Sequence, residues 1–287
     1  MKKSGFVTLI GRSNVGKSTL LNALVGMKIA ITTPKPQTTR FPIHGIVNDE
    51  RGQAVFIDTP GIFEKAHNRL TEILNERARE AVRDIDVLVY MVDPTRPIGN
   101  EEHIILRLIE PIKKPKIIAI NKIDLAEVPY IAEYRALIPQ FDAHVEVSAR
   151  TSKGLDEFKT AVFDLLPEGT PFYGEHEITN LENRTWLSEM IREKLFLQLG
   201  AELPYNLGVE IETVEDRQTK MGKPMLYVKA NILTTAPQYK RMIIGSGGRR
   251  IKDIGSAARK ELEAILGKSL FLDLEVVVDE HWPERLV

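Results

Sequence analysis

"GRSNVGKST" occupies residues Gly11 to Thr19 and comes directly after the apolar run "FVTLI" (Phe6 to Ile10). Its first eight residues fit the pattern GxxxxGK[ST], in which glycines let backbone N–H groups turn inward around phosphates. The helix expected to follow adds its positive N-terminal end. Lys17 should reach the β- and γ-phosphates, and the Ser18 hydroxyl should ligate Mg²⁺. The stretch therefore predicts a nucleoside triphosphate site between a strand and a helix.

A second motif, "FIDTPG" (Phe56 to Gly61), lies at the end of another apolar run. Asp58 at a strand end can hold the magnesium ion as a Walker-B acid. Gly61 can present a backbone N–H to the γ-phosphate and act as a hinge. Taken alone DTPG is only a turn sequence, but after a phosphate loop it indicates a second part of the same site.

"NKID" (Asn121 to Asp124), after the run "KIIAI", decides the base. The Asp124 carboxylate can accept the N1–H and N2–H₂ donors of guanine, whereas adenine would leave it desolvated and unpaired. Sites of that kind discriminate by roughly 10⁴–10⁵. Asn121 suits the other edge of the ring and ties this loop to the phosphate loop, and the Lys122 stem can lie over the base. "SAR" (Ser148 to Arg150) would place backbone N–H groups near the guanine O6, so we predict GTP rather than ATP.

The first half of the chain alternates short apolar runs with helical patterns. Runs such as "QAVFID" and "DVLVYMVD" are almost continuously apolar, as expected for parallel strands buried on both faces. The alternation predicts an α/β domain with a doubly wound, six-stranded, mostly parallel sheet. Proline, glycine and polar residues then cluster in "LLPEGTPFYGEHEITN", which is typical of a linker. We place the first domain at residues 1–170, the linker at 171–182 and a second domain at 183–287.

The second half has a different order of elements: helix, strand, strand, helix, helix, strand, which indicates a smaller α+β domain. "IIGSGGRRIKDIG" (Ile243 to Gly255) joins its last two helices through a glycine turn, Gly245–Gly248. From Gln238 to Lys268 there are eight basic and three acidic residues, in a chain with a net charge of −1. A basic patch on a nearly neutral protein suggests a polyanionic partner. From charge alone, a solvated helix face explains the patch equally well.

Composition excludes several classes of protein. There is no cysteine, so disulfides and thiolate metal sites are excluded and a reducing cytosol fits. No stretch approaches the ~20 apolar residues of a membrane span. The N-terminal "MKKSGFVTLIG" has too short an apolar part for a leader, so we expect it to be a first strand.

The motifs together identify a resemblance. The set is that of translation-factor-class GTPases, and "SNVGKS" with "PQTTR" (Pro36 to Arg40) resembles the Era-like branch of bacterial GTPases. The resemblance implies that the segment with the threonine pair before Arg40 is the first switch segment, and that one of the two threonines closes on Mg²⁺ in the GTP state. We expect Thr39 rather than Thr38. Asn14 matches the asparagine that helps hold a potassium ion in relatives. Ser13 departs from the proline common there, which should alter loop stiffness more than chemistry.

Ile62 stands where Ras-like enzymes have a glutamine that orients the attacking water, and isoleucine cannot hydrogen-bond water. We therefore expect slow hydrolysis, or water positioned by a monovalent cation or a partner, with potassium acting through Asn14. The Era-like class carries hydrophobic residues at this position.

The predicted site residues form three groups. Lys17, Thr39 and Gly61 should act in hydrolysis, while Ser18, Thr39 and Asp58 should ligate Mg²⁺. The nucleotide site should comprise Gly11, Arg12, Ser13, Asn14, Val15, Gly16, Lys17, Ser18, Thr19, Asp58, Thr59, Pro60, Gly61, Ile62, Asn121, Lys122, Asp124, Ser148, Ala149 and Arg150.

The second half resembles a type II KH domain, a module whose GXXG loop clamps about four unpaired nucleotides. The side of the following helix that carries Ile251 and Ile254, together with the neighbouring strand, would form the apolar wall for the bases. Ser246 departs from the lysine that relatives often carry. The predicted RNA-contacting residues are Lys240, Arg241, Gly245, Ser246, Gly247, Gly248, Arg249, Arg250 and Lys252.

Across nearly the whole chain this order of domains resembles that of the Era family. The resemblance implies a Mg²⁺-dependent GTPase that binds the 3′ end of small-subunit (16S) ribosomal RNA and promotes maturation of the 30S subunit. It also implies a cytoplasmic location with some peripheral association with the inner face of the cell membrane. We expect a monomer, and the short end "HWPERLV" should trim the tail after the last strand.

Other functions remain open from the residues alone. The chain could be an RNA-binding assembly scaffold in which nucleotide is mainly structural. The second half could be a small α+β domain that docks on protein or only stabilises the chain. A double-GTPase relative is set aside because the sequence contains one phosphate loop, and no acid/base pair or nucleophile of another enzyme type stands out.

Overall fold

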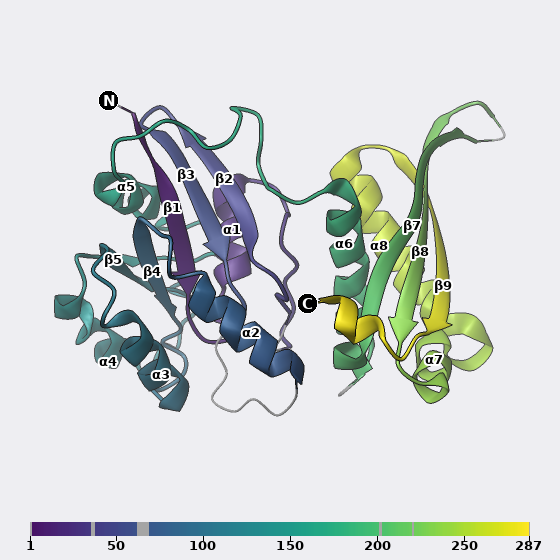
Figure 1. The fold of residues 1–287 in the computed structure, drawn as a ribbon, viewed down its shortest axis with the longest axis horizontal. Coiled ribbons are helices and arrows are strands. Elements are labelled where there is room, and N and C mark those ends of the chain that lie inside the picture. The colour runs from purple at the N-terminus through teal and green to yellow at the C-terminus, as the bar shows by residue number, and fades with distance from the viewer. Residues whose placement is uncertain (1, 36–37, 62–68, 201–202, 220, 287) are drawn as a thin grey trace. The chain divides into compact units, whose positions relative to one another are not determined.

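The computed structural model describes the chain except residues 1, 36–37, 62–68, 201–202, 220 and 287. It divides into two compact units, Met1–Asn180 and Leu181–Val287 (Figure 1). Each unit has its own sheet and its own buried side chains.

The first unit is built on a six-stranded sheet with the order β2-β3-β1-β4-β5-β6. β2 is antiparallel to β3 and the other pairs are parallel, which confirms the predicted doubly wound, mostly parallel sheet. The strands are β1 (Lys3–Ile10), β2 (Ile43–Asp49), β3 (Gly52–Asp58), β4 (Val87–Val92), β5 (Lys116–Ile120) and β6 (Ala143–Glu146). Every residue of β3 and β4 is buried, which explains their apolar sequences.

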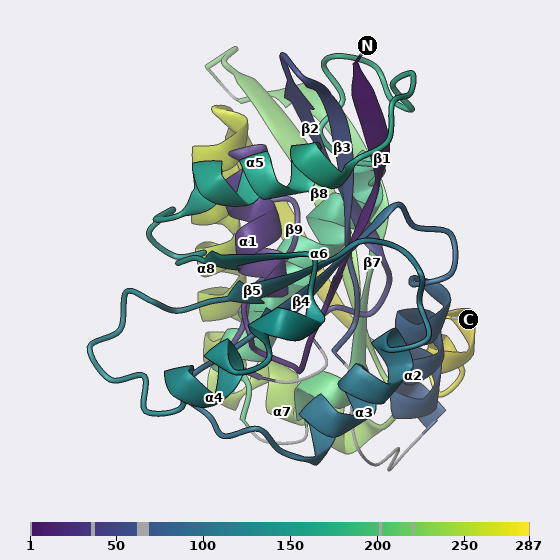
Figure 2. The ribbon, with the colours of Figure 1, turned by 90° about the vertical axis from the view of Figure 1, so that its left-hand side faces the viewer.

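Helices cover both faces of this sheet (Figure 2). They are α1 (Lys17–Val25), α2 (Arg69–Glu80), α3 (Asn100–Ile109), α4 (Ile131–Arg135) and α5 (Leu155–Leu165), with a 3₁₀ turn η1 (Ile138–Gln140). One buried cluster joins β4 and β5 to the second, third and fourth helices through residues such as Leu88, Ile105 and Tyr134. On the other face, the rings of Phe56 and Phe158 lie 6.0 Å apart and join β3 to α5. This packing aligns the carboxyl ends of β1, β3, β4 and β5, where the predicted motifs lie.

The first unit continues ten residues past the predicted domain boundary, into the segment expected to be a linker. The Ile178 carbonyl accepts a hydrogen bond from the Ile46 amide at 2.9 Å, and Thr179 forms an antiparallel bridge with Gly45. The Gln53 side-chain oxygen accepts the Tyr173 amide at 3.0 Å. Because these backbone groups find partners on β2 and β3, the polar segment has a fixed course along the edge of the sheet.

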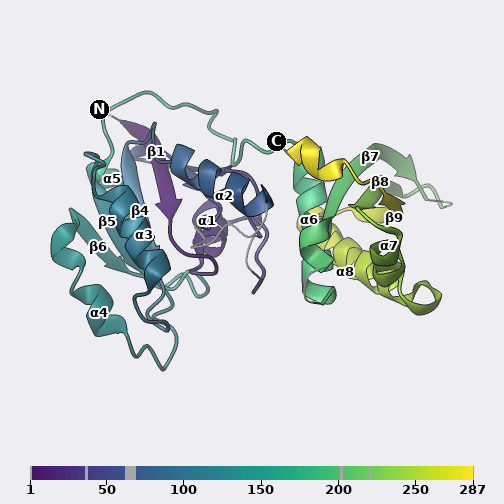
Figure 3. The same cartoon turned by 60° about the horizontal axis from the view of Figure 1, so that its bottom comes forward.

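The second unit follows the predicted order of elements. It contains α6 (Asn183–Gln198), η2 (Leu203–Asn206), β7 (Leu207–Gln218), β8 (Pro224–Thr234), α7 (Pro237–Ile244), η3 (Ser246–Gly248), α8 (Arg249–Leu266), β9 (Ser269–Val278) and η4 (Trp282–Leu286). Its sheet has the order β7-β8-β9, with β8 antiparallel to β7 and parallel to β9. Figure 3 shows α6 and α8 together on one face of this sheet.

The core of the second unit lies between that face and its two long helices. α8 contributes Ile254, Ala258 and Leu262, and β8 contributes alternate residues that include Val228 and Ile232. Ile254 is therefore a core residue, and the expectation that it belongs to the wall for RNA bases is wrong. Trp282 packs at the start of β7, where a Cβ on Gly208 would come within 2.8 Å of its ring.

Candidate nucleotide site and RNA-binding turn

The phosphate loop (Gly11–Ser18) links β1 to α1 as predicted. Gly16 caps the helix with φ of 107°, in the left-handed region that favours glycine. The Lys17 ammonium donates to the Gly11 carbonyl at 3.0 Å and the Arg12 carbonyl at 2.9 Å. Burial lowers the pKa of Lys17 to about 8, and the nearby Asp58 carboxylate opposes that shift. A cavity of about 310 Å³ lies against this loop, lined also by Thr33, Thr39 and Lys122.

The three predicted magnesium ligands lie together at this cavity. Ser18 Oγ donates to Asp58 Oδ2 at 2.6 Å, and Thr39 Oγ1 lies 3.3 Å from the same oxygen and 3.2 Å from Ser18 Oγ. Asp58 is fully buried, and its Oδ1 has no hydrogen-bond partner among the residues that the structure describes. Burial raises the pKa of Asp58 despite the nearby Lys17 ammonium. A buried carboxylate beside two hydroxyls is the oxygen donor set that Mg²⁺ prefers, so these residues fit the ion.

The neighbouring threonine is used differently. Thr38 Oγ1 is 2.7 Å from Thr33 Oγ1 and donates to the Lys35 carbonyl at 2.7 Å. It thus stabilises the turn of its own segment, while Thr39 faces Asp58. This arrangement favours Thr39 as the magnesium ligand.

Other predicted residues lie at the part of the nucleotide site that would hold the phosphates. Asn14 Nδ2 donates to the Pro34 carbonyl at 2.6 Å, which joins the phosphate loop to the switch segment. Thr59 is buried and its hydroxyl donates to the Leu9 carbonyl at 2.8 Å, between β3 and β1. Gly61 lies against the phosphate loop, since a Cβ there would come within 2.8 Å of the Ser13 amide. Ile62 lies outside the described residues.

The part of the site that would hold the base is formed by two loops, Asn121–Asp124 and Ser148–Arg150. Asn121 Nδ2 donates to the Val15 carbonyl at 2.7 Å, and its Oδ1 accepts the Ala149 amide at 2.9 Å. Ser148 Oγ donates to Asp124 Oδ1 at 2.7 Å, and Arg150 Nε lies 3.3 Å from Asp124 Oδ2. Asn121 therefore ties both loops to the phosphate loop, as predicted. The Asp124 carboxylate is oriented by two neighbours, which prepares it to accept two N–H groups on one edge of a base.

Sequence reasoning missed the segment after β4 that borders this site. Arg12 Nε pairs with Glu101 at 2.5 Å and its Nη1 with Glu102 at 3.1 Å, both in the first turn of α3. Arg96 Nη2 donates to the Ser13 carbonyl at 3.1 Å. The available signal was the position of Asp93 directly after the apolar run "VLVYMV", which resembles that of Asp58 at the end of "AVFID" and of Asn121 after "KIIAI".

The predicted RNA turn joins two helices. α7 ends at Ile244, Gly245–Gly248 forms a tight turn that departs from helical geometry at Gly245 and Gly247, and α8 begins at Arg249. Gly247 and Gly248 have φ of 60° and 72°, and a Cβ on either would meet nothing within 4 Å. The conformation therefore selects glycine, while the open space leaves the backbone accessible to a ligand.

Basic and apolar side chains surround this turn. Arg241, Arg249, Arg250 and Lys252 are exposed and Lys240 is partly exposed. A cavity of about 380 Å³ begins at the first turn of α8 and extends to β9. Its lining residues are Ile251, Lys252, Gly255, Ser256, Arg259, Leu272 and Leu274. Ile251 of α8 and the neighbouring strand β9, through Leu272 and Leu274, line this cavity as expected, whereas Ile254 does not line it.

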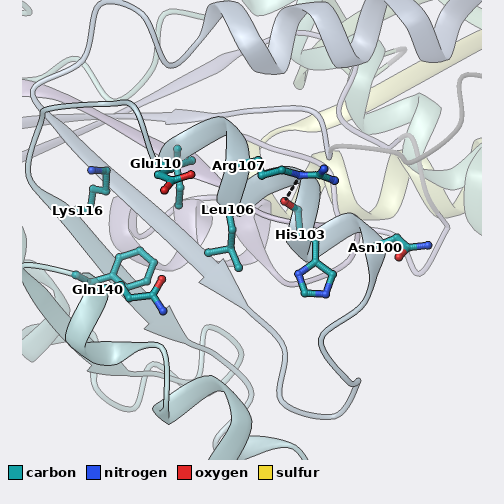
Figure 4. A pocket seen from close by; sticks show the side chains of 9 residues that line it. Asn100, His103, Leu106, Arg107, Glu110, Lys116 and Gln140 are labelled. Carbon is teal, nitrogen blue, oxygen red and sulfur yellow. Dashed lines mark hydrogen bonds between the residues drawn. The ribbon is translucent and has the colours of Figure 1, made fainter.

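Another cavity, of about 790 Å³, lies beside α3 in the first unit (Figure 4). Lys116 and Glu110 lie at one end and Asn100 at the other, and the labelled side chains do not converge on one point. The volume of a cavity therefore does not identify the site in this chain. Among the described residues, no helix is long and apolar enough to cross a membrane.

Family models define the class of protein. A model for "50S ribosome-binding GTPase" matches residues 6–122, and a model for "KH domain" matches residues 202–283. The chain is thus a phosphate-loop GTPase with a KH domain, which confirms the predicted fold class.

Comparisons over the whole chain give the particular family. GTPase Era of Carboxydothermus hydrogenoformans is 40% identical, covering 99% of this chain and 95% of its own. GTPase Era of Ectopseudomonas mendocina is 39% identical, covering 99% and 94%. A crystal structure of Era with MgGDPNP and nucleotides 1506–1542 of 16S ribosomal RNA matches with a TM-score of 0.89 at 36% identity, covering 100% and 98%. An Aquifex aeolicus Era variant bound to GDP.AlF4- gives 0.88 at 37% identity, covering 99% and 98%. The chain belongs to the Era family of GTPases.

Proposed function

We propose that this GTPase binds the 3′ end of small-subunit ribosomal RNA through its KH unit and acts in maturation of the 30S subunit. The observation that carries the proposal is the open glycine turn Gly245–Gly248 between two helices, flanked by exposed arginines and by a cavity with both aliphatic and basic lining residues. Backbone N–H groups and cations suit a sugar-phosphate chain, and the cavity suits bases. One Era structure that matches over the whole chain holds MgGDPNP and nucleotides 1506–1542 of 16S ribosomal RNA.

The test is the binding of a labelled RNA that matches this 3′ end, measured with a GTP analogue, with GDP and without nucleotide. We expect tighter binding in the GTP-like state, and affinity that falls as salt rises because phosphate contacts release counterions. Ser246→Asp combined with Gly247→Asp should abolish binding, because two carboxylates would meet the phosphate backbone. The matched control adds the same two charges at the exposed Asn100 and Gln140 of the first unit.

Two results would contradict the proposal: equal binding by wild type and the glycine-turn variant, or binding by neither. Single-turnover GTP hydrolysis with and without the RNA tests the alternative, an assembly scaffold with structural nucleotide. That alternative predicts the same hydrolysis rate in both conditions.

Potassium is the second part of the proposal. Isoleucine at position 62 offers no group to orient the attacking water. Asn14 lines the phosphate cavity and is fixed to Pro34, so its side-chain oxygen is available to a monovalent cation. Turnover should be faster in potassium than in sodium, and Asn14→Ala should remove the difference. A full potassium response in that variant would exclude Asn14 from this role.

The monomeric state and the peripheral membrane association remain predictions. Sedimentation of the purified chain tests the first. Co-flotation with anionic phospholipid vesicles tests the second.

A further inference from the structure

The residue after β4, Asp93, is a buried carboxylate to which no role has been assigned so far. It is 2% exposed. Its Oδ2 accepts the Lys122 ammonium at 2.5 Å, and Arg96 Nε lies 3.3 Å from the same oxygen. Its Oδ1 accepts both the amide of Thr95, at 3.0 Å, and the hydroxyl of Thr95, at 2.7 Å. Burial would raise its pKa, but the hydrogen bonds from Lys122 and Thr95 outweigh this, so its pKa is lowered.

Lys122 is held at both ends by this arrangement. Its backbone follows β5 with φ of 63°, a conformation uncommon for a residue with a side chain. Its ammonium group is fixed by Asp93, so the four-carbon stem between the two anchors has little freedom. Lys122 lines the nucleotide cavity, whereas Asp93 does not. The carboxylate thus determines where an apolar surface of that cavity lies.

We propose that Asp93 is a positioning residue that holds the Lys122 stem against the guanine ring and so controls how tightly nucleotide is retained. The inference rests on the proposed nucleotide site. It predicts a contact with the flat face of the base, which differs from the reading of the base edge by Asp124. Because the stem packs on the ring without touching the 2-amino group, Asp93 should affect guanine and hypoxanthine nucleotides equally.

A purely local role for Asp93 makes a different prediction. Its bonds to Thr95 alone would make it a turn-forming residue of the β4–α3 connection. In that case its removal would lower stability without a specific dependence on Lys122. Asp93→Asn separates the two roles, because the amide oxygen can still accept from Thr95 while the charge that holds Lys122 is lost. The substitution also removes the charge that pairs with Arg96 Nε, while the bond from Arg96 Nη2 to the Ser13 carbonyl does not involve Asp93.

The experiment measures dissociation constants of GDP and IDP with Mg²⁺ for wild type, Asp93→Asn, Lys122→Met and the double variant. We expect Asp93→Asn to weaken both nucleotides about tenfold, the effect of losing one hydrogen bond to a charged group. Lys122→Met, which keeps an unbranched stem without the ammonium, should weaken both to a similar extent. In the Lys122→Met background, Asp93→Asn should then have less than a twofold effect.

The matched control is Asp86→Asn, at the opposite end of β4. Asp86 also accepts a backbone amide, that of Phe6 at 2.9 Å, and lies 3.7 Å from Lys114, but it is far along the strand from the nucleotide loops. It should leave both affinities unchanged. Calorimetric unfolding of each variant confirms that it is folded.

Three outcomes decide the inference. Wild-type affinity in Asp93→Asn, or an equal loss with and without Lys122, would overturn it. A loss for GDP much larger than for IDP would also overturn it, because Asp93 would then act on the edge reading by Asp124. A wild-type chain that bound neither nucleotide would instead overturn the proposed function itself.

Discussion

At the scale of single residues, the two adjacent threonines of the switch segment have different partners. Thr39 faces Asp58 and Ser18, while Thr38 bonds to Thr33 and to the Lys35 carbonyl. Thr39→Ala should therefore weaken binding of a non-hydrolysable GTP analogue by about tenfold or more and slow hydrolysis, and it should leave GDP binding nearly unchanged. Thr38→Ala is the control, with a smaller effect on both. Titration of each nucleotide checks this, and a larger effect of Thr38→Ala would reverse the assignment.

The lowered pKa of Lys17 predicts that the chain takes up protons when it binds nucleotide. Its pKa in the free chain is lowered to about 8, because burial disfavours the ammonium more than Asp58 stabilises it. Bound phosphates would favour the charged form and raise the pKa. Below pH 8 the lysine is already charged, so affinity for MgGDP should be constant there and decline as pH rises above 8. Calorimetric titration at pH 8 in buffers of different ionisation enthalpy should show uptake of about half a proton. Heats that do not depend on the buffer would contradict this.

At the scale of elements, the β2–β3 hairpin depends on one glycine. Gly52 has φ of 144°, and a Cβ there would lie 1.8 Å from the Lys3 carbonyl oxygen on neighbouring β1. Gly26, at the end of α1, has φ of 76° but nothing within 4 Å of a Cβ. Gly26→Ala should cost about 1 kcal/mol of unfolding free energy from backbone strain alone. Gly52→Ala should cost about 3 kcal/mol or more, because β1 and β3 must separate as well. Denaturant unfolding measures both, and equal losses would refute the backbone clash.

Elements were predictable where local sequence determines them. Parallel strands buried on both faces need continuous apolar runs, so β3 and β4 were visible in the sequence. The motif loops come directly after predicted strands, so the positions of these loops at the strand ends could also be predicted. Ile254 was misassigned because spacing places it beside Ile251 on α8 but cannot say which side of the helix faces the core. The pairs Arg12–Glu101, Arg96–Ser13 and Asp93–Lys122 were not predictable either, since the sheet brings each pair together from distant parts of the chain.

At the scale of the whole molecule, two units with separate cores should respond separately to their ligands. MgGDP binds the native first unit, so at 100 times its dissociation constant it should stabilise that unit by about 2.7 kcal/mol. Differential scanning calorimetry should show one transition moving to higher temperature while the other stays in place. The 3′-end RNA should move the other transition. A single transition that moves with either ligand would show that the units unfold together.

Both tryptophans of the chain, Trp186 and Trp282, belong to the second unit, on α6 and η4. Light absorbed by indole is therefore emitted only from the unit that carries the RNA turn. A guanine nucleotide with a fluorescent acceptor would sit in the other unit, and resonance energy transfer to it would depend on the separation of the two. The natural sequence thus contains fluorescence donors in one unit only. When labelled GDP is exchanged for a labelled GTP analogue, a change in transfer efficiency would report a rearrangement of the units, with no change to the protein.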